Sequence, residues 1–230
     1  YIEGPGDIIK DGDGGLNVQE YSPDYTGDIV VKDGAFRLRG YRNNPLPNAG
    51  TVYLGVNDTA NRGTVNFSLY MDRDGTASEI DVDQNIIVSG RSDSTRIGTY
   101  QPNHNDVANF NGDIDLSNFA TEGSTLEFRL YVEDTLDSMV PNAADDNEGL
   151  FREESFINLN GDITGGNKRI RTVVQQNYWS GGGYVNTMEP VPGASGTNEL
   201  NMMVFFTMAG TNTGSPSIRG RIRSHKRSTW

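Results

Sequence analysis

The feature that most restricts the fold of this chain is the alternation of apolar and polar residues with a period of two. Its clearest example is Thr64–Met71, in which every second residue from Val65 onward is apolar. Successive side chains of a β-strand point to opposite faces, so this pattern is typical of a half-buried strand. No sustained period of 3.6 residues is present. The sequence therefore predicts strands with little or no helix.

The other predicted strands are short and are separated by turns rich in Gly, Asn, Asp and Ser. A chain of 230 residues with 28 glycines and 34% hydrophobic residues fits this layout. No fixed repeat and no linker is apparent. We expect one all-β domain over 1–230, an antiparallel β-sandwich or jelly roll of roughly 12–14 short strands. Residues 1–27 are predicted to be a loop-rich N-terminal segment, and 217–230 a basic C-terminal strand or tail.

The charge of the chain is unevenly distributed. The net charge is −12, yet residues 219–230 hold Arg219, Arg221, Arg223, Lys226 and Arg227 and no acid. Removing those five charges from −12 leaves −17 for residues 1–218. An acidic surface disfavours binding to nucleic acid or anionic membranes, except through the basic tail. A basic end on an acidic body indicates contact between copies of the chain.

Three segments share an R-x-R pattern that places arginines on one face of a strand and Leu or Ile on the other. They contain Arg37 and Arg39, Arg169 and Arg171, and Arg219, Arg221 and Arg223. The pattern predicts subunit contacts by strand addition and by arginine–carboxylate pairs. Two alternatives are a basic lining that faces packaged nucleic acid and an ordinary exposed strand with weak ion pairs.

The stretch IKDGDGGLNVQE matches part of a calcium-binding EF-hand loop. Asp11, Asp13 and Glu20 stand where carboxylate ligands are expected, but Ile9 occupies the first ligand position and the flanks are not helical. It is therefore not an EF-hand. Two interpretations remain. One is a calcium site in a β-protein loop, and the other is an Asp-Gly hairpin between Ile8–Ile9 and Leu16–Val18. For MDRDG at 71–75 the turn interpretation is favoured.

The strand Ser78–Asp83 places Glu79, Asp81 and Asp83 on one face. Locally it resembles the E-I-D-x-E signature of the laminarinase- and agarase-like glycoside hydrolases, which are jelly rolls. The resemblance covers about five residues. It implies that Glu79 is the nucleophile, that Asp81 orients it and that Asp83 is the acid/base, although that family has Glu at the last position. The alternative is a polar outer face on a half-buried strand.

Other side chains offer weaker candidates. Tyr178, Trp179 and Tyr184 surround a glycine loop and could form a sugar or receptor platform or could pack in the core. His104 and His225 share no metal-ligand spacing, and the absence of cysteine excludes disulfides and thiolate sites. Glu133–Glu154 carries eight acids and is expected to be a solvated loop or a cation- or partner-binding loop. No apolar run approaches the roughly 18 residues of a membrane span.

The sequence thus predicts a non-enzymatic, self-assembling structural subunit of a virion or of an extracellular filament or layer, whose partners are copies of itself. This layout is similar to jelly-roll coat proteins. The chain begins at Tyr1 rather than Met, which fits either processing or trimming. One alternative is an extracellular adhesin or carbohydrate-binding module with a loop calcium site and a glycan or cell-surface receptor as its partner. The other is a jelly-roll glycoside hydrolase. No cofactor other than Ca²⁺ is expected.

Overall fold

The structure is a computed structural model. It describes residues 1–40, 43–57, 61–71, 79–100, 107–120, 124–134, 156–165, 168, 170–180, 183–186, 199–210 and 216–227. These residues form strands, turns and loops, as the period-two alternation predicts, and they contain no helix. Among them there is accordingly no helix that could cross a membrane.

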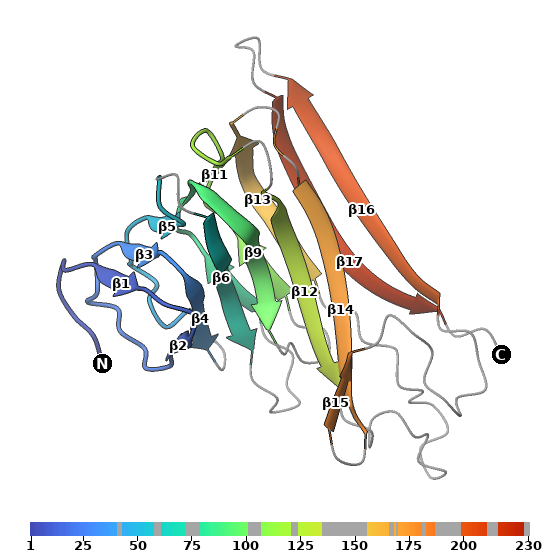
Figure 1. Cartoon of the computed structure of the whole chain (residues 1–230), viewed down its shortest axis with the longest axis horizontal. Helices are drawn as coiled ribbons and strands as arrows, with labels where there is room; N and C mark the ends of the chain where they lie inside the picture. Colours follow the sequence, from blue (N-terminus) through green and yellow to red (C-terminus); the bar gives the residue numbers. More distant parts are fainter. Residues whose placement is uncertain are drawn as a thin grey trace.

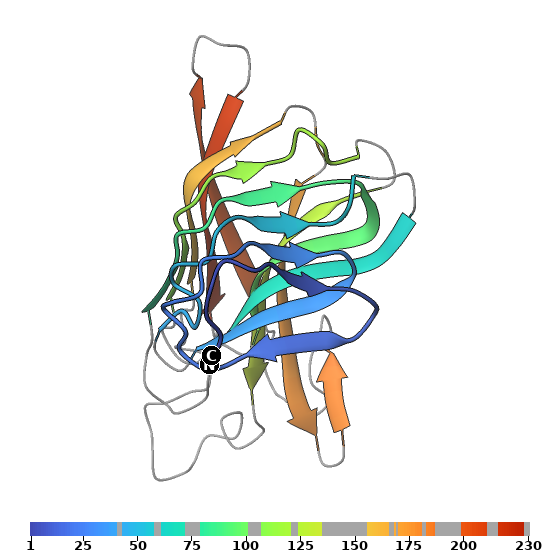
Figure 2. The ribbon, with the colours of Figure 1, turned by 90° about the vertical axis from the view of Figure 1, so that its left-hand side faces the viewer.

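The chain winds through six coils, and each coil contributes one strand to each of two sheets (Figures 1 and 2). The strands of sheet 1, in coil order, are β1 (Ile8–Lys10), β3 (Ile29–Val31), β5 (Val52–Leu54), β8 (Ile86–Val88), β11 (Ile114–Asp115) and the last part of β13 (Phe156–Thr164). The strands of sheet 2 are β2 (Gly15–Val18), β4 (Gly34–Gly40), β6 (Asn61–Met71), β9 (Arg91–Tyr100), β12 (Leu126–Asp134) and β14 (Ile170–Ser180). Each coil therefore stacks on the one before it.

Neighbouring strands of these coils are parallel in both sheets. The predicted antiparallel sandwich or jelly roll is therefore wrong. Alternation indicates which face of a strand is buried, but not the strand's partner or its direction. Parallel sheets usually have both faces covered and read as continuous apolar runs. Here one face of each strand points outward, so the sequence imitates an antiparallel sheet.

A third group of strands forms a flank that continues sheet 1. It consists of β7 (Glu79–Val82), β10 (Val107–Phe110) and the first part of β13, and its pairs are parallel. The long strand β13 joins the flank to sheet 1, because Phe156–Leu159 pairs with β10 whereas Ile163–Thr164 pairs with β11. Sheet 1 and the flank together make one sheet that curls around the core like half a barrel.

Antiparallel pairs appear only towards the C-terminal end of the described chain. β15 (Gly183–Asn186) pairs with β14, and β16 (Glu199–Gly210) pairs with β17 (Pro216–Arg227). β17 also pairs with β13 at positions 218–223. Both edges of β17 are thus occupied within the chain over these residues. β17 overlaps the segment 217–230, and it is an inner strand, so the outer edge at this end belongs to β16.

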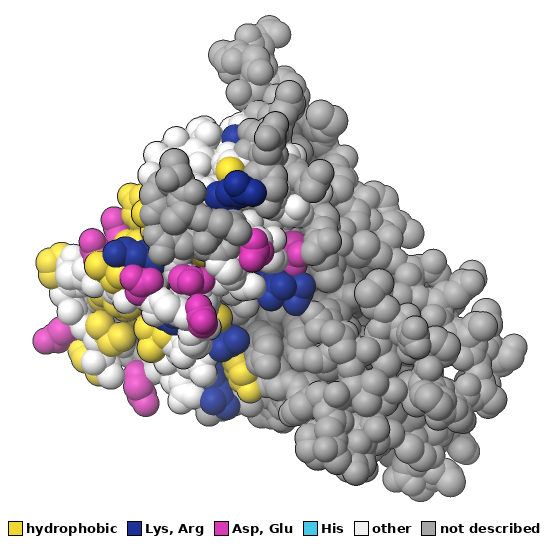
Figure 3. Space-filling model, viewed as in Figure 1, with side chains coloured by type: hydrophobic (Ala, Val, Ile, Leu, Met, Phe, Trp, Pro, Cys, Tyr) yellow, Lys and Arg dark blue, Asp and Glu magenta, His cyan; other side chains and the backbone are white. Residues whose placement is uncertain are grey.

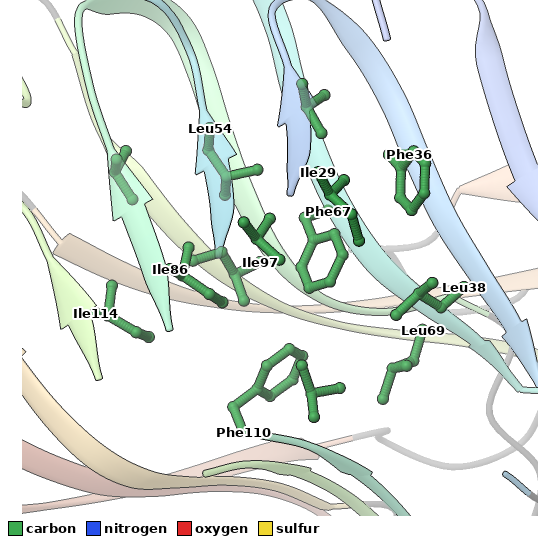
Figure 4. Packing of buried hydrophobic residues seen from close by; sticks show 14 of the residues in the cluster. Ile29, Phe36, Leu38, Leu54, Phe67, Leu69, Ile86, Ile97, Phe110 and Ile114 are labelled. Atoms are coloured by element: carbon green, nitrogen blue, oxygen red, sulfur yellow. The ribbon is translucent and has the colours of Figure 1, made fainter. Parts of the chain in front are cut away.

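The hydrophobic core lies between the two sheets and the flank. Figure 4 shows side chains that meet there: Ile29, Leu54, Ile86 and Ile114 from sheet 1, Phe36, Leu38, Phe67, Leu69 and Ile97 from sheet 2, and Phe110 from the flank, all at most 2% exposed. Equivalent positions of successive coils stack directly. Phe36 and Phe67, for example, are register partners whose ring centroids lie 6.3 Å apart. A single coil could not bury these side chains, so the core exists only through stacking.

A three-residue corner recurs in every coil just before or at the start of the sheet 1 strand. The six corners are Gly6-Asp7-Ile8, Gly27-Asp28-Ile29, Gly50-Thr51-Val52, Gln84-Asn85-Ile86, Gly112-Asp113-Ile114 and Gly161-Asp162-Ile163, and their last residues are register partners. At four corners, those of Asp7, Asp28, Asn85 and Asp113, the middle side chain accepts a hydrogen bond from the backbone N–H of the next coil. Asp28 N donates to Asp7 Oδ1 (3.1 Å), and Thr51 N donates to Asp28 Oδ1 (2.8 Å). No fixed repeat is apparent in the sequence because the spacing of this motif varies, for example 21, 23 and 28 residues.

The turn at Asp11-Gly12 is a corner rather than the predicted hairpin. β1 pairs with β3 and β2 pairs with β4, so the strands on either side of this turn belong to different sheets. Gly12 has a φ of 78°, and Gly34, at the equivalent corner of coil 2, has a φ of 75°. The positive φ that Asp-Gly favours is present, but it turns the chain from sheet 1 into sheet 2. Residues 1–27, predicted as a loop-rich segment, hold coil 1.

Candidate functional site

Three predicted site residues lie together on the outer face of the flank. Glu79 and Asp81 of β7 are exposed, whereas Ile80 and Val82 between them are buried in the core. Asp83 follows β7 and is also exposed. The predicted alternation is confirmed, and it places the three carboxylates in a line along the edge strand of the flank.

Asparagines of the next coil bind these carboxylates, and asparagines of the coil after that bind the first asparagines, in two rows. In the first row, Asn109 Nδ2 donates to Glu79 Oε1 (2.8 Å) and Asp81 Oδ1 (2.9 Å), and Asn158 Nδ2 donates to Asn109 Oδ1 (2.7 Å). In the second row, Asn111 Nδ2 donates to Asp83 Oδ1 (2.7 Å), and Asn160 Nδ2 donates to Asn111 Oδ1 (2.8 Å). We call Asn109, Asn111, Asn158 and Asn160 the asparagine ladder. Its amide dipoles all point the same way, with their N–H ends towards the carboxylates.

This geometry gives the three carboxylates a structural role, because they accept hydrogen bonds from a neighbouring coil and so stabilise the stack. Asn109 bridges Glu79 and Asp81, so one amide holds two like charges side by side, and hydrogen bonds to charged acceptors are stronger than neutral ones. Glu79 and Asp83 are four residues apart on an extended strand, a backbone separation of about 13 Å. Retaining glycosidases hold their two carboxyl groups about 5–5.5 Å apart. The glycoside hydrolase alternative stays a prediction, and the ladder gives it no support.

The proposed calcium loop is organised around an ammonium group. Lys10 is only 8% exposed, and its Nζ donates to the carbonyl oxygens of Asp11 (3.1 Å), Asp33 (3.0 Å) and Gly12. Asp11 Oδ1 accepts from the backbone N–H of Gly12 (2.9 Å), and Asp13 and Glu20 are exposed. Among the residues that the structure describes, no three His, Asp or Glu side chains are grouped as metal ligands. Calcium binding by Asp11, Asp13 and Glu20 stays a prediction.

Arginines gather on the outer face of sheet 2. Arg37 and Arg39 of β4 lie there, as the R-x-R pattern predicts, because Phe36 and Leu38, which alternate with them, point into the core. Arg96 of β9 and Arg129 of β12 lie on the same face. We call Arg37, Arg39, Arg96 and Arg129 the arginine face. In Figure 3, basic side chains appear over the region where β4, β6, β9 and β12 run in Figure 1.

One carboxylate is buried on this outer face. Glu127 of β12 is 1% exposed, and its Oε2 accepts from Arg96 Nε (3.1 Å) and Arg129 Nη2 (2.9 Å). The two arginine side chains are 27% and 20% exposed, so they cover the carboxylate. Arg39 is fixed differently, with its guanidinium carbon 4.6 Å from the centre of the Tyr70 ring, within the range of a cation–π contact.

For several of the remaining predicted residues the structure describes the strand and its pairing but not the side chain. Trp179 of β14 and Tyr184 of β15 are register partners, and Tyr178 pairs with Val185. Arg171 lies opposite Glu127 in the β12–β14 register, and Arg219, Arg221 and Arg223 belong to β17. The side chains of the predicted residues named here lie outside the described part: Arg171, Tyr178, Trp179, Tyr184, Arg219, Arg221 and Arg223. Arg169, His104 and most of Glu133–Glu154 lie outside it as well. The roles predicted for them stay predictions.

Sequence reasoning missed the asparagine ladder, the corner motif, Arg96, Arg129 and Glu127. A signal for the ladder and the corner was present, because Asn109–Ile114 reads NFNGDI and Asn158–Ile163 reads NLNGDI. Alignment of these two segments also brings Asp81–Ile86, DVDQNI, into register. No comparable signal exists for Glu127, because its burial depends on arginines from two different coils.

The chain was compared with known protein families, with curated proteins and with solved structures, and none of them matches it.

Proposed function

We propose that this chain is a non-enzymatic structural protein of an extracellular filament or layer, or of a virion, and that its copies associate end to end. The observation that carries the proposal is the distribution of exposed apolar side chains. Among the described residues, the large hydrophobic side chains that are exposed are Tyr1 (64%), Ile9 (57%), Leu16 (37%) and Tyr21 (56%). All four belong to the N-terminal end of the stack.

Strand edges support the same association. β1 is an outer strand of sheet 1, β2 is an outer strand of sheet 2, and β16 is the outer strand at the other end of the chain. Figure 1 shows β1 and β2 at one end of the long axis and β16 and β17 at the other. Unpaired strand edges are templates for pairing with another chain. Pairing of β1 in one copy with β16 in the next would continue sheet 1 from copy to copy.

Charge supports a head-to-tail arrangement. Residues 1–24 contain six acids (Glu3, Asp7, Asp11, Asp13, Glu20 and Asp24) and one base, Lys10, whereas 216–227 contains five bases and no acid. The two ends of the molecule therefore attract one another, and two copies of the same end repel one another. A head-to-tail contact that does not close into a ring produces a filament.

The experiment is light scattering on a sizing column, over concentrations from about 1 µM to about 1 mM. We expect oligomers that grow with concentration and dissociate in about 1 M salt, where screening acts over about 3 Å. The double variant Ile9→Lys, Leu16→Lys should remain a monomer, and Asn118→Lys, which adds charge at an exposed turn away from coil 1, should assemble as the parent does. A monomeric parent at every concentration, or an assembling double variant, would reject the proposal.

A further inference from the structure

The arginine face has a floor of small residues. In the register of sheet 2, Arg37, Ser68, Gly98 and Arg129 are consecutive partners on β4, β6, β9 and β12. Ser68 and Gly98 are buried although they belong to an outward-facing row. Gly98 has no room for a side chain, because a Cβ atom there would lie 1.8 Å from the carbonyl oxygen of Arg129. In this row, therefore, two small residues, Ser68 and Gly98, separate the long side chains of Arg37 and Arg129.

The charge on this face is opposite to that of the whole chain. The arginine face carries four positive charges, and Glu127 supplies one negative charge between Arg96 and Arg129. The net charge of the chain is −12, so the sign of this group is opposite to that of the chain. Arginine is well suited to oxyanions, because its planar guanidinium matches the geometry of carboxylate, sulfate and phosphate groups.

Ser68 gives an independent reason to expect a ligand here. Its side chain is 3% exposed, and its Oγ has no hydrogen-bond partner among the described residues. A buried hydroxyl that lacks a partner has lost its hydrogen bonds to water without gaining one in the protein, which is unfavourable. This hydroxyl lies in the centre of the row, between Arg37 and Gly98, where it can donate to an acceptor that the arginines also attract.

We propose that the arginine face and Ser68 bind the carboxylate or sulfate groups of an acidic polysaccharide. A polymer fits better than a single small ion, because Arg37 and Arg129 are separated by three strand spacings, a backbone distance of about 14 Å. The Arg37 guanidinium lies beside Gly15 of β2, on the side of β4 away from Arg129, so one small anion does not reach both guanidinium groups, whereas an extended chain of repeated charges can. The proposal does not depend on end-to-end association, because coil 1 is not part of the row.

The test is calorimetric titration at constant ionic strength with polygalacturonate, dextran sulfate, neutral dextran, free sulfate and single-stranded DNA. We expect saturable binding to at least one of the two acidic polysaccharides and none to neutral dextran. Free sulfate should bind more weakly than the polymer. Free sulfate that binds as tightly as the polymer would identify a small-ion site, and tighter binding of DNA would identify a nucleic-acid site. Either result would overturn the proposal, as would the failure of both polysaccharides to bind.

Single substitutions test whether the row from Arg37 to Arg129 is the binding site. Arg37→Gln should weaken binding about tenfold, the scale of one charge-assisted hydrogen bond. Arg91→Gln removes the same charge from an exposed position at the start of β9 and should leave the affinity within about twofold of the parent. Ser68→Ala removes a buried donor without a described partner, so it should fold at least as stably as the parent and still bind more weakly. Parent-like affinity in both Arg37→Gln and Ser68→Ala would overturn the proposal, and Ser68→Ala keeps the test valid if Arg37→Gln does not fold.

Discussion

The Oδ1 atom of Asp113 accepts a hydrogen bond of 2.8 Å from the backbone N–H of Asp162, 49 residues later in the chain. Asn85 accepts in the same way from the backbone N–H of Asp113 (3.0 Å). A side chain at the corner of one coil thus binds the backbone of the next coil. Because the coils differ in length, these contacts fix where each new coil starts relative to the previous one.

We expect Asp113→Ala to lower the free energy of unfolding by about 1 kcal/mol, since it removes the acceptor for the Asp162 N–H. Asp113→Asn keeps an oxygen at the same position and should lose less. Urea unfolding of the parent and both variants measures the difference. Equal losses in Asp113→Ala and Asp113→Asn would show that the hydrogen bond at Oδ1 does not hold the coils in register.

The glycines of the corner motif give a second prediction. A Cβ atom on Gly27 would lie 2.2 Å from the carbonyl oxygen of Gly6, whereas a Cβ on Gly6, in the first coil, would have no atom within 4 Å. Gly27→Ala should therefore lower the free energy of unfolding by about 1–3 kcal/mol, the usual cost of overpacking. Gly6→Ala is the matched control and should change it much less. Similar urea midpoints for the two variants would contradict this account.

The strands were predictable from the sequence, and the way they pair was not. The alternation over Thr64–Met71 describes β6 correctly, because Val65, Phe67 and Leu69 are buried in the core, whereas Asn66 and Tyr70 on the other face are partly exposed. The same alternation occurs in an antiparallel hairpin, so it carries no information about direction. Direction is set here by the corners, such as Asp11-Gly12, which lead the chain into the other sheet.

The candidate site was predictable only in part. Glu79, Asp81 and Asp83 share a face, as the alternation predicts, but the partners of these carboxylates come from a later coil. The sequence placed Arg37 and Arg39 on one face for the same local reason. Glu127 reads as an ordinary outward-facing acid, and its burial arises from Arg96 on a different coil. Contacts between coils of unequal length are not visible in a local pattern.

Lys10 gives a third prediction, because its ammonium group binds three carbonyl oxygens at the first corner. Lys10→Met keeps most of the side-chain volume and removes the donor. We expect the free energy of unfolding to fall by about 1–3 kcal/mol, since the carbonyls of Asp11, Gly12 and Asp33 lose a shared partner. Lys32→Met is the control, because Lys32 lies at the same corner region of coil 2 and is less buried. If both variants unfold at the same urea concentration, this role of Lys10 is wrong.

A fourth prediction concerns calcium binding in the loop that contains Lys10, Asp11 and Asp13. Because Lys10 already binds the loop carbonyls, we expect the Tm of the parent to be the same with added calcium and with chelator. Differential scanning calorimetry measures this directly. A calcium-induced rise in Tm that disappears in the Asp11→Ala, Asp13→Ala double variant would instead establish a calcium site in this loop.

The last prediction concerns stability at alkaline pH. Tyr25 is 1% exposed, its hydroxyl donates to the carbonyl of Asp28 (2.7 Å), and it accepts from the N–H of Ile8 (3.0 Å). Burial raises the pKa of the Tyr25 phenol above its ordinary value of 10.0, and the carboxylates of Asp7 and Asp28 raise the pKa further, whereas the Ile8 hydrogen bond lowers it.

The folded state therefore keeps the Tyr25 proton at a pH where the unfolded chain has lost it. This contribution to stability is complete below about pH 9 and falls as the pH rises above about 10 towards the folded pKa. Tyr25→Phe should be less stable than the parent at neutral pH, because it loses both hydrogen bonds, and it should lose less stability between about pH 9 and pH 11. Urea unfolding across that range measures both effects, with the exposed Tyr21→Phe as the control. An alkaline loss in Tyr25→Phe as steep as that of the parent would show that other groups cause it.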